Sequence, residues 1–147
     1  MRGESMTREE KREYLRRVRV AYKLICSYEE ELLEHRLIIQ CAPIGCYEQI
    51  IRGSENRGNL EPSVLKILEY EEKIKAQICK YIDIKSKCLE AIERLTDDNC
   101  KIALRLHYIN GRTIYETQEL LHYGETQIKN IINKALDELS LTESDLN

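Results

Sequence analysis

The stretch INGRTIYETQELLHYGETQIKNIINKALDEL, residues 109–139, decides the fold. Asn110-Gly111 suits a turn with positive φ that ends a helix, and Thr113 can cap the helix that follows. Glu116 lies three residues after Thr113, which is the spacing of a capping box. Apolar residues then recur at helical spacing to the end of the stretch. The pattern predicts two short helices joined by a tight turn.

A further short helix is expected just before this stretch, where Asp97 or Asp98 can cap its start. Its inner face should carry Ile102, Ala103, Leu106 and Ile109. The middle helix should direct Leu120 and Leu121 inward and end around residues 122–124. In the last helix the apolar face consists of Ile128, Ile131, Ile132, Ala135, Leu136 and Leu139. The opposite face carries the polar residues Glu125, Thr126, Lys129, Asn130 and Asn133.

Two longer segments with heptad spacing precede these helices. Apolar side chains step by three and four from Leu15 to Ile39, and again from Val64 to Leu95. Proline and glycine residues in CAPIGCYEQIIRGSENRGNLEP interrupt any continuous helix between them. We therefore predict an all-α chain. It has a long, coiled-coil-like antiparallel helical hairpin at 1–94 with a loop at about 42–62, a three-helix unit at 95–140 and an acidic tail at 141–147.

The heptad stripes contain charges and have apolar flanks. Four charged residues stand where an ideal seam would be apolar, which restricts register and partner choice: Glu29, Arg36, Glu71 and Lys85. The flanks that a two-helix hairpin leaves half exposed are Leu33, Leu68, Ile82 and Leu89. Either a second copy of the chain or the C-terminal unit should cover them, and we favour a homodimer.

The net charge is −3 and the sequence pI is about 5.7, which argues against a protein that coats nucleic acid non-specifically. Basic residues nevertheless crowd the start of the first long helix: Arg8, Lys11, Arg12, Arg16, Arg17, Arg19 and Lys23. The acids Glu29, Glu30, Glu31 and Glu34 follow. Such a run is either a solvated helix face or a strip that contacts phosphates.

Catalytic, metal and membrane functions lack their usual signatures. The six cysteines contain no C-x-x-C pair, and three of them, Cys26, Cys79 and Cys88, suit small buried hydrophobes in a reducing cytosol. The three histidines are scattered, and neither a nucleophile elbow nor a phosphate-binding glycine loop is present. We expect neither an enzyme nor a metal or cofactor site, and no membrane-spanning segment.

A family resemblance rests on Leu104-Arg105-Leu106-His107-Tyr108, Gly111-Arg112-Thr113, Glu116, Leu121, Ile128 and Lys134-Ala135-Leu136. This run resembles region 4 of sigma-70-type transcription factors. With the long helical N-terminal part, the chain looks like the small phage and prophage regulators of the sigma-70 region-4-like, ArpU-like group. The resemblance implies a phage-derived transcriptional regulator in the cytoplasm of a bacterial host cell, with a helix-turn-helix that binds duplex DNA.

The resemblance also implies which side chains meet DNA. In that family the last helix enters the major groove, while the start of the preceding helix and the far end of the last one touch phosphates. The implied base contacts are Glu125, Thr126, Lys129, Asn130 and Asn133. The implied phosphate contacts are Arg112, Thr113 and Lys134.

The helix-turn-helix stretch departs from the family pattern and carries little net charge. Gln118 stands where a small residue is usual and Thr117 where an apolar one precedes it. His122 stands where glycine is common, and Gly124 where serine or threonine caps the last helix. Residues 96–136 hold five acids and five bases, so the basic N-terminal run, a second copy or RNA polymerase would have to supplement DNA affinity. Two alternatives remain open: a three-helix unit that touches no DNA, and a phage-encoded interaction protein that binds a host protein, either RNA polymerase or a defence enzyme.

Overall fold

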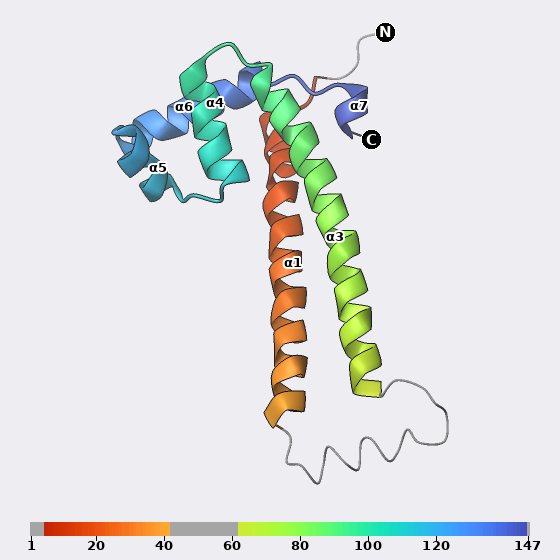
Figure 1. The fold of residues 1–147 in the computed structure, drawn as a ribbon. Helices are drawn as coiled ribbons and strands as arrows, with labels where there is room; N and C mark the ends of the chain where they lie inside the picture. The colour runs from red at the N-terminus through yellow and green to blue at the C-terminus, as the bar shows by residue number, and fades with distance from the viewer. Residues whose placement is uncertain (1–4, 42–61, 147) are drawn as a thin grey trace. The chain divides into compact units, whose positions relative to one another are not determined.

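The computed structural model describes residues 5–41 and 62–146, and over these ranges the chain is all-helical, as predicted. The two long helices are α1 (Arg8–Cys41) and α3 (Pro62–Glu93). They are followed by α4 (Asp98–Leu104), the π-helical segment η1 (Arg105–Ile109), α5 (Ile114–Leu121), α6 (Glu125–Glu138) and α7 (Glu143–Leu146) (Figure 1). The predicted loop at about 42–62 lies almost wholly outside the described residues.

The chain forms two compact units. Unit 1 lies within Met1–Ala21 and Tyr81–Asn147, and unit 2 lies within Tyr22–Lys80. The start of α1 therefore shares a unit with the C-terminal helices, although the two are far apart in sequence. The predicted domain limits at residues 94 and 140 follow motif spacing, and they stay a prediction.

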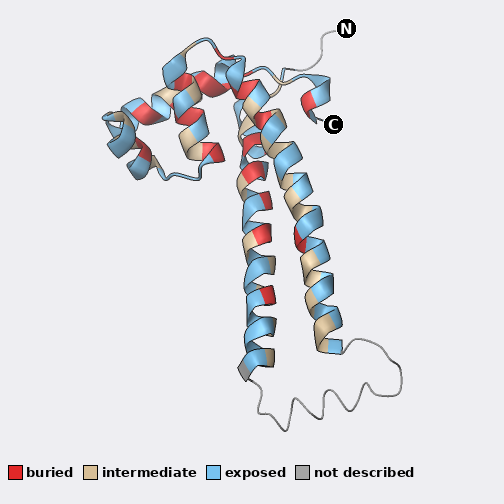
Figure 2. Ribbon diagram, viewed as in Figure 1, coloured by how far each residue is buried: buried red, intermediate tan, exposed pale blue. Residues whose placement is uncertain are grey.

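Unit 1 has a continuous apolar core to which α1, α3, α4, η1 and α6 all contribute. The side chains of Leu15, Ile92, Leu104, Ile128 and Leu136 are fully buried in it. Figure 2 shows the buried positions gathered on α4, α6 and the adjoining turns of α1 and α3. Because each of these helices buries one stripe against the others, the short helices that follow α3 are held by tertiary packing more than by their own propensity.

Unit 2 consists of parts of α1 and α3, and few of its apolar side chains are buried. The buried ones among its described residues are Ile25, Leu32 and Ile74. Arg36 and Glu71 form an ion pair of 2.6 Å between the two helices. The seam charges therefore pair with each other in this case, which fits their expected effect on register.

Three sequence predictions about individual side chains are wrong. Leu120 is 54 % exposed, because Thr117 occupies the buried position of α5 and the helix turns Leu120 to the other face. Ile102 is 41 % exposed, because Cys100, Ala103 and Leu104 form the inner face of α4. Cys79 is exposed and not buried as predicted, whereas Cys88 is buried as expected. In each case a short helix or a flank position left the inward face ambiguous.

The acidic C-terminal residues contain one buried carboxylate, at Asp145. Its carboxylate accepts hydrogen bonds from Arg94 at 2.6 Å and from the backbone nitrogen of Thr142 at 2.7 Å. The buried hydroxyl of Tyr14 donates to the backbone carbonyl of Asp145 at 2.9 Å. These contacts hold α7 against the rest of unit 1. Among the described helices, none has the length and apolar character needed to cross a bilayer.

Candidate nucleic-acid interface

The start of α5 is fixed by two local devices that the sequence signals. Thr113 is the N-cap, its hydroxyl oxygen accepts a hydrogen bond from the Glu116 amide at 3.1 Å, and the Glu116 carboxylate accepts from the Thr113 amide at 2.9 Å. Gly111 has a φ of 71°, a backbone conformation that glycine adopts without strain. The predicted capping box and turn are confirmed.

The helix before this turn ends differently from the regular α-helix expected to continue to residue 109. The amide of Asn110 donates to the carbonyl of Arg105, and that of Arg112 donates to the carbonyl of Leu106. These spans of five and six residues make η1 a wider turn than an α-helix. The carbonyl of Arg112 also accepts a hydrogen bond from Nδ1 of His107 at 2.9 Å. The wide turn thus brings His107 beside the start of α5.

Helix α5 and the turn after it accommodate three of the residues that depart from the family pattern. His122 ends α5 in the left-handed conformation, with a φ of 59°, where glycine would be less strained. Gly124 is the N-cap of α6, and its carbonyl accepts from the amide of Ile128. Thr117 is fully buried, and its hydroxyl donates to the carbonyl of Thr113 at 2.8 Å. A polar residue is tolerated there because its hydrogen bond is made inside α5.

One face of α6 is buried and the other carries polar side chains. The buried residues Ile128, Ile132, Ala135 and Leu136 belong to the unit 1 core. Of the predicted base contacts, Glu125, Thr126, Lys129 and Asn130 are exposed, and Asn133 is half-buried. The structure therefore places all five on α6 away from its apolar stripe, although Asn133 is already in contact with another helix.

Three of the predicted contact residues on α6, Glu125, Lys129 and Lys134, take part in ion pairs in the free protein. Lys129 lies 2.5 Å from Glu125 one turn earlier, and this hydrogen bond lowers the pKa of Glu125. Lys134 lies 3.4 Å from Asp97, the N-cap of α4, and the pKa of Lys134 is raised mainly by that hydrogen bond. Both pairs are exposed, so the contribution of each to stability is small and DNA could replace the carboxylate at little cost.

The three predicted phosphate contacts lie at two separate places. Arg112 and Thr113 are adjacent and exposed at the start of α5. The hydroxyl oxygen of Thr113 accepts the capping hydrogen bond, so its own proton stays available for a phosphate oxygen. Lys134 lies near the end of α6, beside α4. These positions would bracket a duplex only if the exposed face of α6 faces it.

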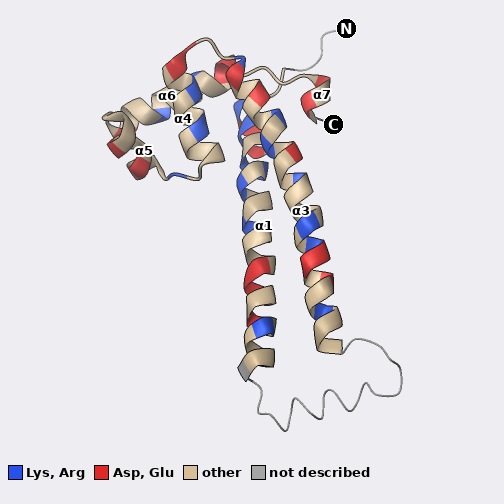
Figure 3. Ribbon diagram, in the orientation of Figure 1, with Lys and Arg blue, Asp and Glu red and all other residues tan. Residues whose placement is uncertain are grey.

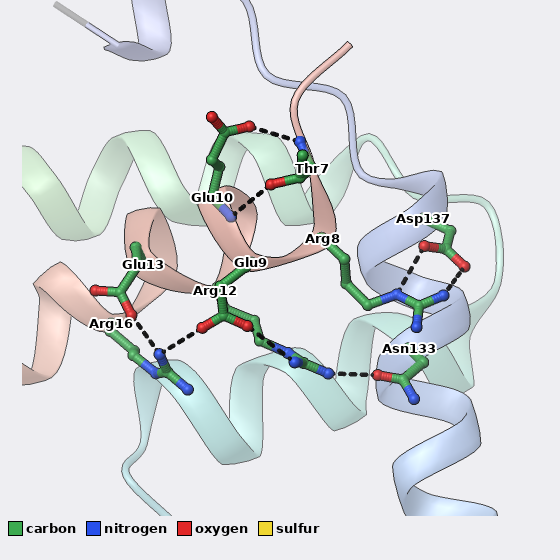
Figure 4. Close-up of polar contacts among 9 residues, drawn as sticks. All are labelled: Thr7, Arg8, Glu9, Glu10, Arg12, Glu13, Arg16, Asn133 and Asp137. Atoms are coloured by element: carbon green, nitrogen blue, oxygen red, sulfur yellow. Dashed lines mark hydrogen bonds and ion pairs between the residues drawn. The ribbon is translucent and has the colours of Figure 1, made fainter.

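The basic start of α1 packs against the end of α6, as Figure 4 shows. Arg8 makes two hydrogen bonds to the carboxylate of Asp137, at 2.9 and 2.7 Å. Nζ of Lys11 donates at 3.0 Å to the carbonyl of Leu136 in the last turn of α6, which also accepts a longer hydrogen bond, of 3.3 Å, from the amide of Leu139. Arg12 donates to the side-chain oxygen of Asn133 at 2.6 Å. Part of the basic run therefore binds α6, an outcome that neither interpretation of the run included.

Arg16 and Arg17 belong to the same turns of α1 but do not bind α6. Arg16 forms ion pairs with Glu9 and Glu13 of its own helix, and the guanidinium of Arg17 lies over the ring of Tyr14. Thr7 and Glu10 exchange hydrogen bonds at the start of α1 (Figure 4). Figure 3 shows basic positions concentrated in the first turns of α1, acidic positions farther along, and another basic position near its end, where Arg36 lies.

A hollow of about 260 Å³ opens beside the exposed face of α6. It is lined by Arg12, Arg16, His107, Tyr108, Ile114, Lys129, Ile132 and Asn133. Sequence reasoning assigned Lys129 and Asn133 to this region and missed the others. The sequence shows the basic run and the segment at 104–108, but no local pattern in it indicates that the wide turn of η1 and the start of α1 meet at α6.

The described residues offer no site for a metal ion, because no three His, Cys, Asp or Glu side chains within them are suitably placed. Comparison of the chain with protein-family models, curated proteins and solved structures found no match.

Proposed function

We propose that this chain is a DNA-binding transcriptional regulator of phage origin that reads duplex DNA through a helix-turn-helix, acting as a homodimer. In this proposal α5 and α6 are the two helices of the motif and α6 enters the major groove. The long helices α1 and α3 form an antiparallel hairpin, and unit 2 supplies the dimer surface. The proposal places the protein in the bacterial cytoplasm and includes no enzymatic activity.

The observation that carries the proposal is the division of α6 into two faces after a capped turn. Ile128, Ile132 and Leu136 anchor the helix in the core, while Glu125, Thr126, Lys129 and Asn130 project from the opposite side. Asparagine can pair with adenine through two hydrogen bonds, lysine can donate to guanine, and glutamate can accept from cytosine. A rigid helix with such side chains on an exposed face suits base readout.

The low net charge of the α4–α6 segment supports DNA binding through more than one contact region. The α4–α6 segment is close to neutral, so it would bind weakly by itself at physiological salt. Two copies on a palindromic site would combine their affinities, because the second binding event is intramolecular. The exposed leucines of unit 2, Leu33 and Leu37, offer apolar surface for that second copy.

The test is fluorescence anisotropy of the protein against DNA from its own flanking genome, titrated in salt. We expect Lys129→Ala and Asn130→Ala to reduce sequence-selective binding without a change in helicity. Lys66→Ala is a matched control, because Lys66 is 61 % exposed and paired with Glu69, against 56 % exposure for Lys129 paired with Glu125. Unchanged selective affinity in both α6 variants would remove the recognition-helix assignment.

The second candidate function is an interaction protein that binds a host protein, either RNA polymerase or a defence enzyme. The observation that favours it is exposed apolar surface on α5, where Tyr115 is 68 % and Leu120 is 54 % exposed. Retention on DNA-cellulose at low salt separates the two candidates. A protein that passes through the column, yet binds purified RNA polymerase and loses that binding in Tyr115→Ala, would favour the second.

A further inference from the structure

The hollow beside α6 collects positively charged and hydrogen-bonding groups from three elements. Arg12 and Arg16 come from α1, His107 from η1, and Lys129 and Asn133 from α6. No carboxylate is among its lining residues. Lys129 and Asn133 belong both to this lining and to the polar face of α6, so the hollow continues the candidate reading surface toward α1.

The acids that pair with these cations lie outside the lining and are exposed. Glu9, which pairs with both arginines, has 61 % of its side chain exposed, and so does Glu125, which pairs with Lys129. Exposed ion pairs of this kind contribute little, so an incoming anion could take the place of these carboxylates. A phosphate would gain charge-assisted hydrogen bonds from guanidinium groups held at the wall of the hollow.

The floor of the hollow is apolar and small. It consists of Tyr108, Ile114 and Ile132, and the volume of about 260 Å³ is below the roughly 300–1,000 Å³ of pockets that hold whole small molecules. Burial raises the pKa of Tyr108, and the nearby guanidinium groups of Arg12 and Arg16 act in the opposite direction. The space suits one charged group flanked by carbon atoms.

We propose that this hollow binds a backbone phosphate of duplex DNA, with its deoxyribose against the apolar floor, and that Arg12 and Arg16 are phosphate-contacting residues. The inference rests on the proposed function, because it takes α6 to face a duplex. It assigns to the start of α1 a contact beside the groove that α6 enters. Arg12 and Arg16 would also add to the DNA-binding surface the positive charge that the α4–α6 segment lacks.

The test compares the salt dependence of binding to two short duplexes, one from the flanking genome and one of unrelated sequence. Arg16→Gln is the main variant, because Arg16 pairs only with glutamates of its own helix and its loss should not disturb the fold. Arg105→Gln is the control, with 45 % side-chain exposure against 49 % for Arg16, a Glu93 partner at 3.0 Å and the same change in charge. Arg12→Gln is a second variant, checked by circular dichroism because Arg12 also holds Asn133.

We expect Arg16→Gln to lower the log-log salt slope by about one on both duplexes, and Arg105→Gln to leave it unchanged. In ¹H–¹⁵N spectra of the protein, the unrelated duplex at low salt should shift the arginine Nε signals of the hollow. A slope unchanged in both arginine variants would overturn the inference. So would spectra in which inorganic phosphate shifts those signals and the duplex does not, or a protein that binds no duplex at low salt.

The two proposals fail in different ways. Selective binding of the flanking DNA with an unaltered slope in Arg16→Gln would sink the phosphate site and leave the recognition helix intact. Equal binding of both duplexes, with the slope reduced in Arg16→Gln, would support the phosphate site and contradict sequence reading by α6.

Discussion

Unit 1 has one continuous cluster of buried apolar side chains, whereas the described part of unit 2 buries few of its own. In unit 1, helices from both ends of the sequence cover one another. In unit 2, two helices can cover only the seam between them, so Leu33, Leu37, Ile38, Leu65 and Leu68 stay exposed. The difference indicates that unit 1 is stabilised by its own core, and that unit 2 would bury a comparable area only if a partner covered it.

The largest expected effect breaks the core of unit 1. Leu104→Ala removes a fully buried side chain, and we expect it to lower the free energy of unfolding by about 3 kcal/mol, from lost burial and the cavity left behind. Leu32→Ala in unit 2 should cost less, because the seam of two helices is open on its flanks and can relax. Urea denaturation followed by circular dichroism measures both. Equal losses would mean that the two units are packed alike.

The next effect concerns the buried carboxylate of unit 1. Burial alone would raise the pKa of Asp145, but hydrogen bonds from Thr142 and Arg94 outweigh it and the pKa is lowered. A lowered folded-state pKa stabilises the fold above the unfolded value of about 3.9, and this contribution is lost as pH falls through the folded-state pKa. Arg94→Ala should cost about 2 kcal/mol near neutral pH, reduced somewhat by the partial exposure of Arg94.

Acid titration separates this contribution from the others. Asp145→Asn should flatten the fall in stability below pH 4, as followed by urea midpoints at several pH values. A variant with the same acid sensitivity as the parent would show that other carboxylates dominate. Glu72→Gln, an exposed acid of unit 2, is the control and should leave the profile unchanged.

The third effect tests a local device that the sequence already predicts. Thr113→Ala removes the hydroxyl that accepts from the Glu116 amide, and we expect a loss of about 1 kcal/mol in thermal or urea unfolding. Thr126→Ala, in the first turn of α6 and exposed, should have little effect on stability in the absence of DNA. If both substitutions cost the same, the capping box contributes nothing specific.

The capping box of α5 and the contact between α1 and α6 show what sequence alone could and could not predict. Thr113 and Glu116 are three residues apart, so their geometry follows from local chain conformation and was predicted correctly. The contact between Arg12 and Asn133 joins residues 121 positions apart, and no local pattern contains that information. The composition of the hollow could not be predicted for the same reason.

The short helices show a second limit of sequence patterns. In α5, a helix of eight residues, Thr117 and Leu120 both fit an apolar stripe approximately. Hydrophobicity favoured Leu120, but the position that faces the core is that of Thr117, whose hydroxyl is satisfied within the helix. Tertiary packing decided the orientation, and the longer periodic stretch in α6 was predicted well because more residues define its face.

The smallest effect on unfolding, and the sharpest test of the comparison, is expected from the exposed leucines of unit 2. Leu33 and Leu37 are 58 % and 48 % exposed and lie one helical turn apart. Replacing both with glutamine should change the stability of the isolated chain by less than about 0.5 kcal/mol, since surface substitutions remove few contacts. If a second copy covers this face, the same variant should shift the monomer–dimer equilibrium strongly toward monomer in sedimentation velocity.

The control is a substitution of Ile102, an exposed side chain of unit 1, by glutamine, which should leave self-association unchanged. A parent protein that is monomeric at all concentrations would contradict the homodimer and leave the apolar face of unit 2 for a different partner. A dimer that survives the double substitution would place its interface elsewhere on the chain. Because unit 1 has a buried core of its own and unit 2 has few buried side chains, we expect dilution to destabilise unit 2 more than unit 1.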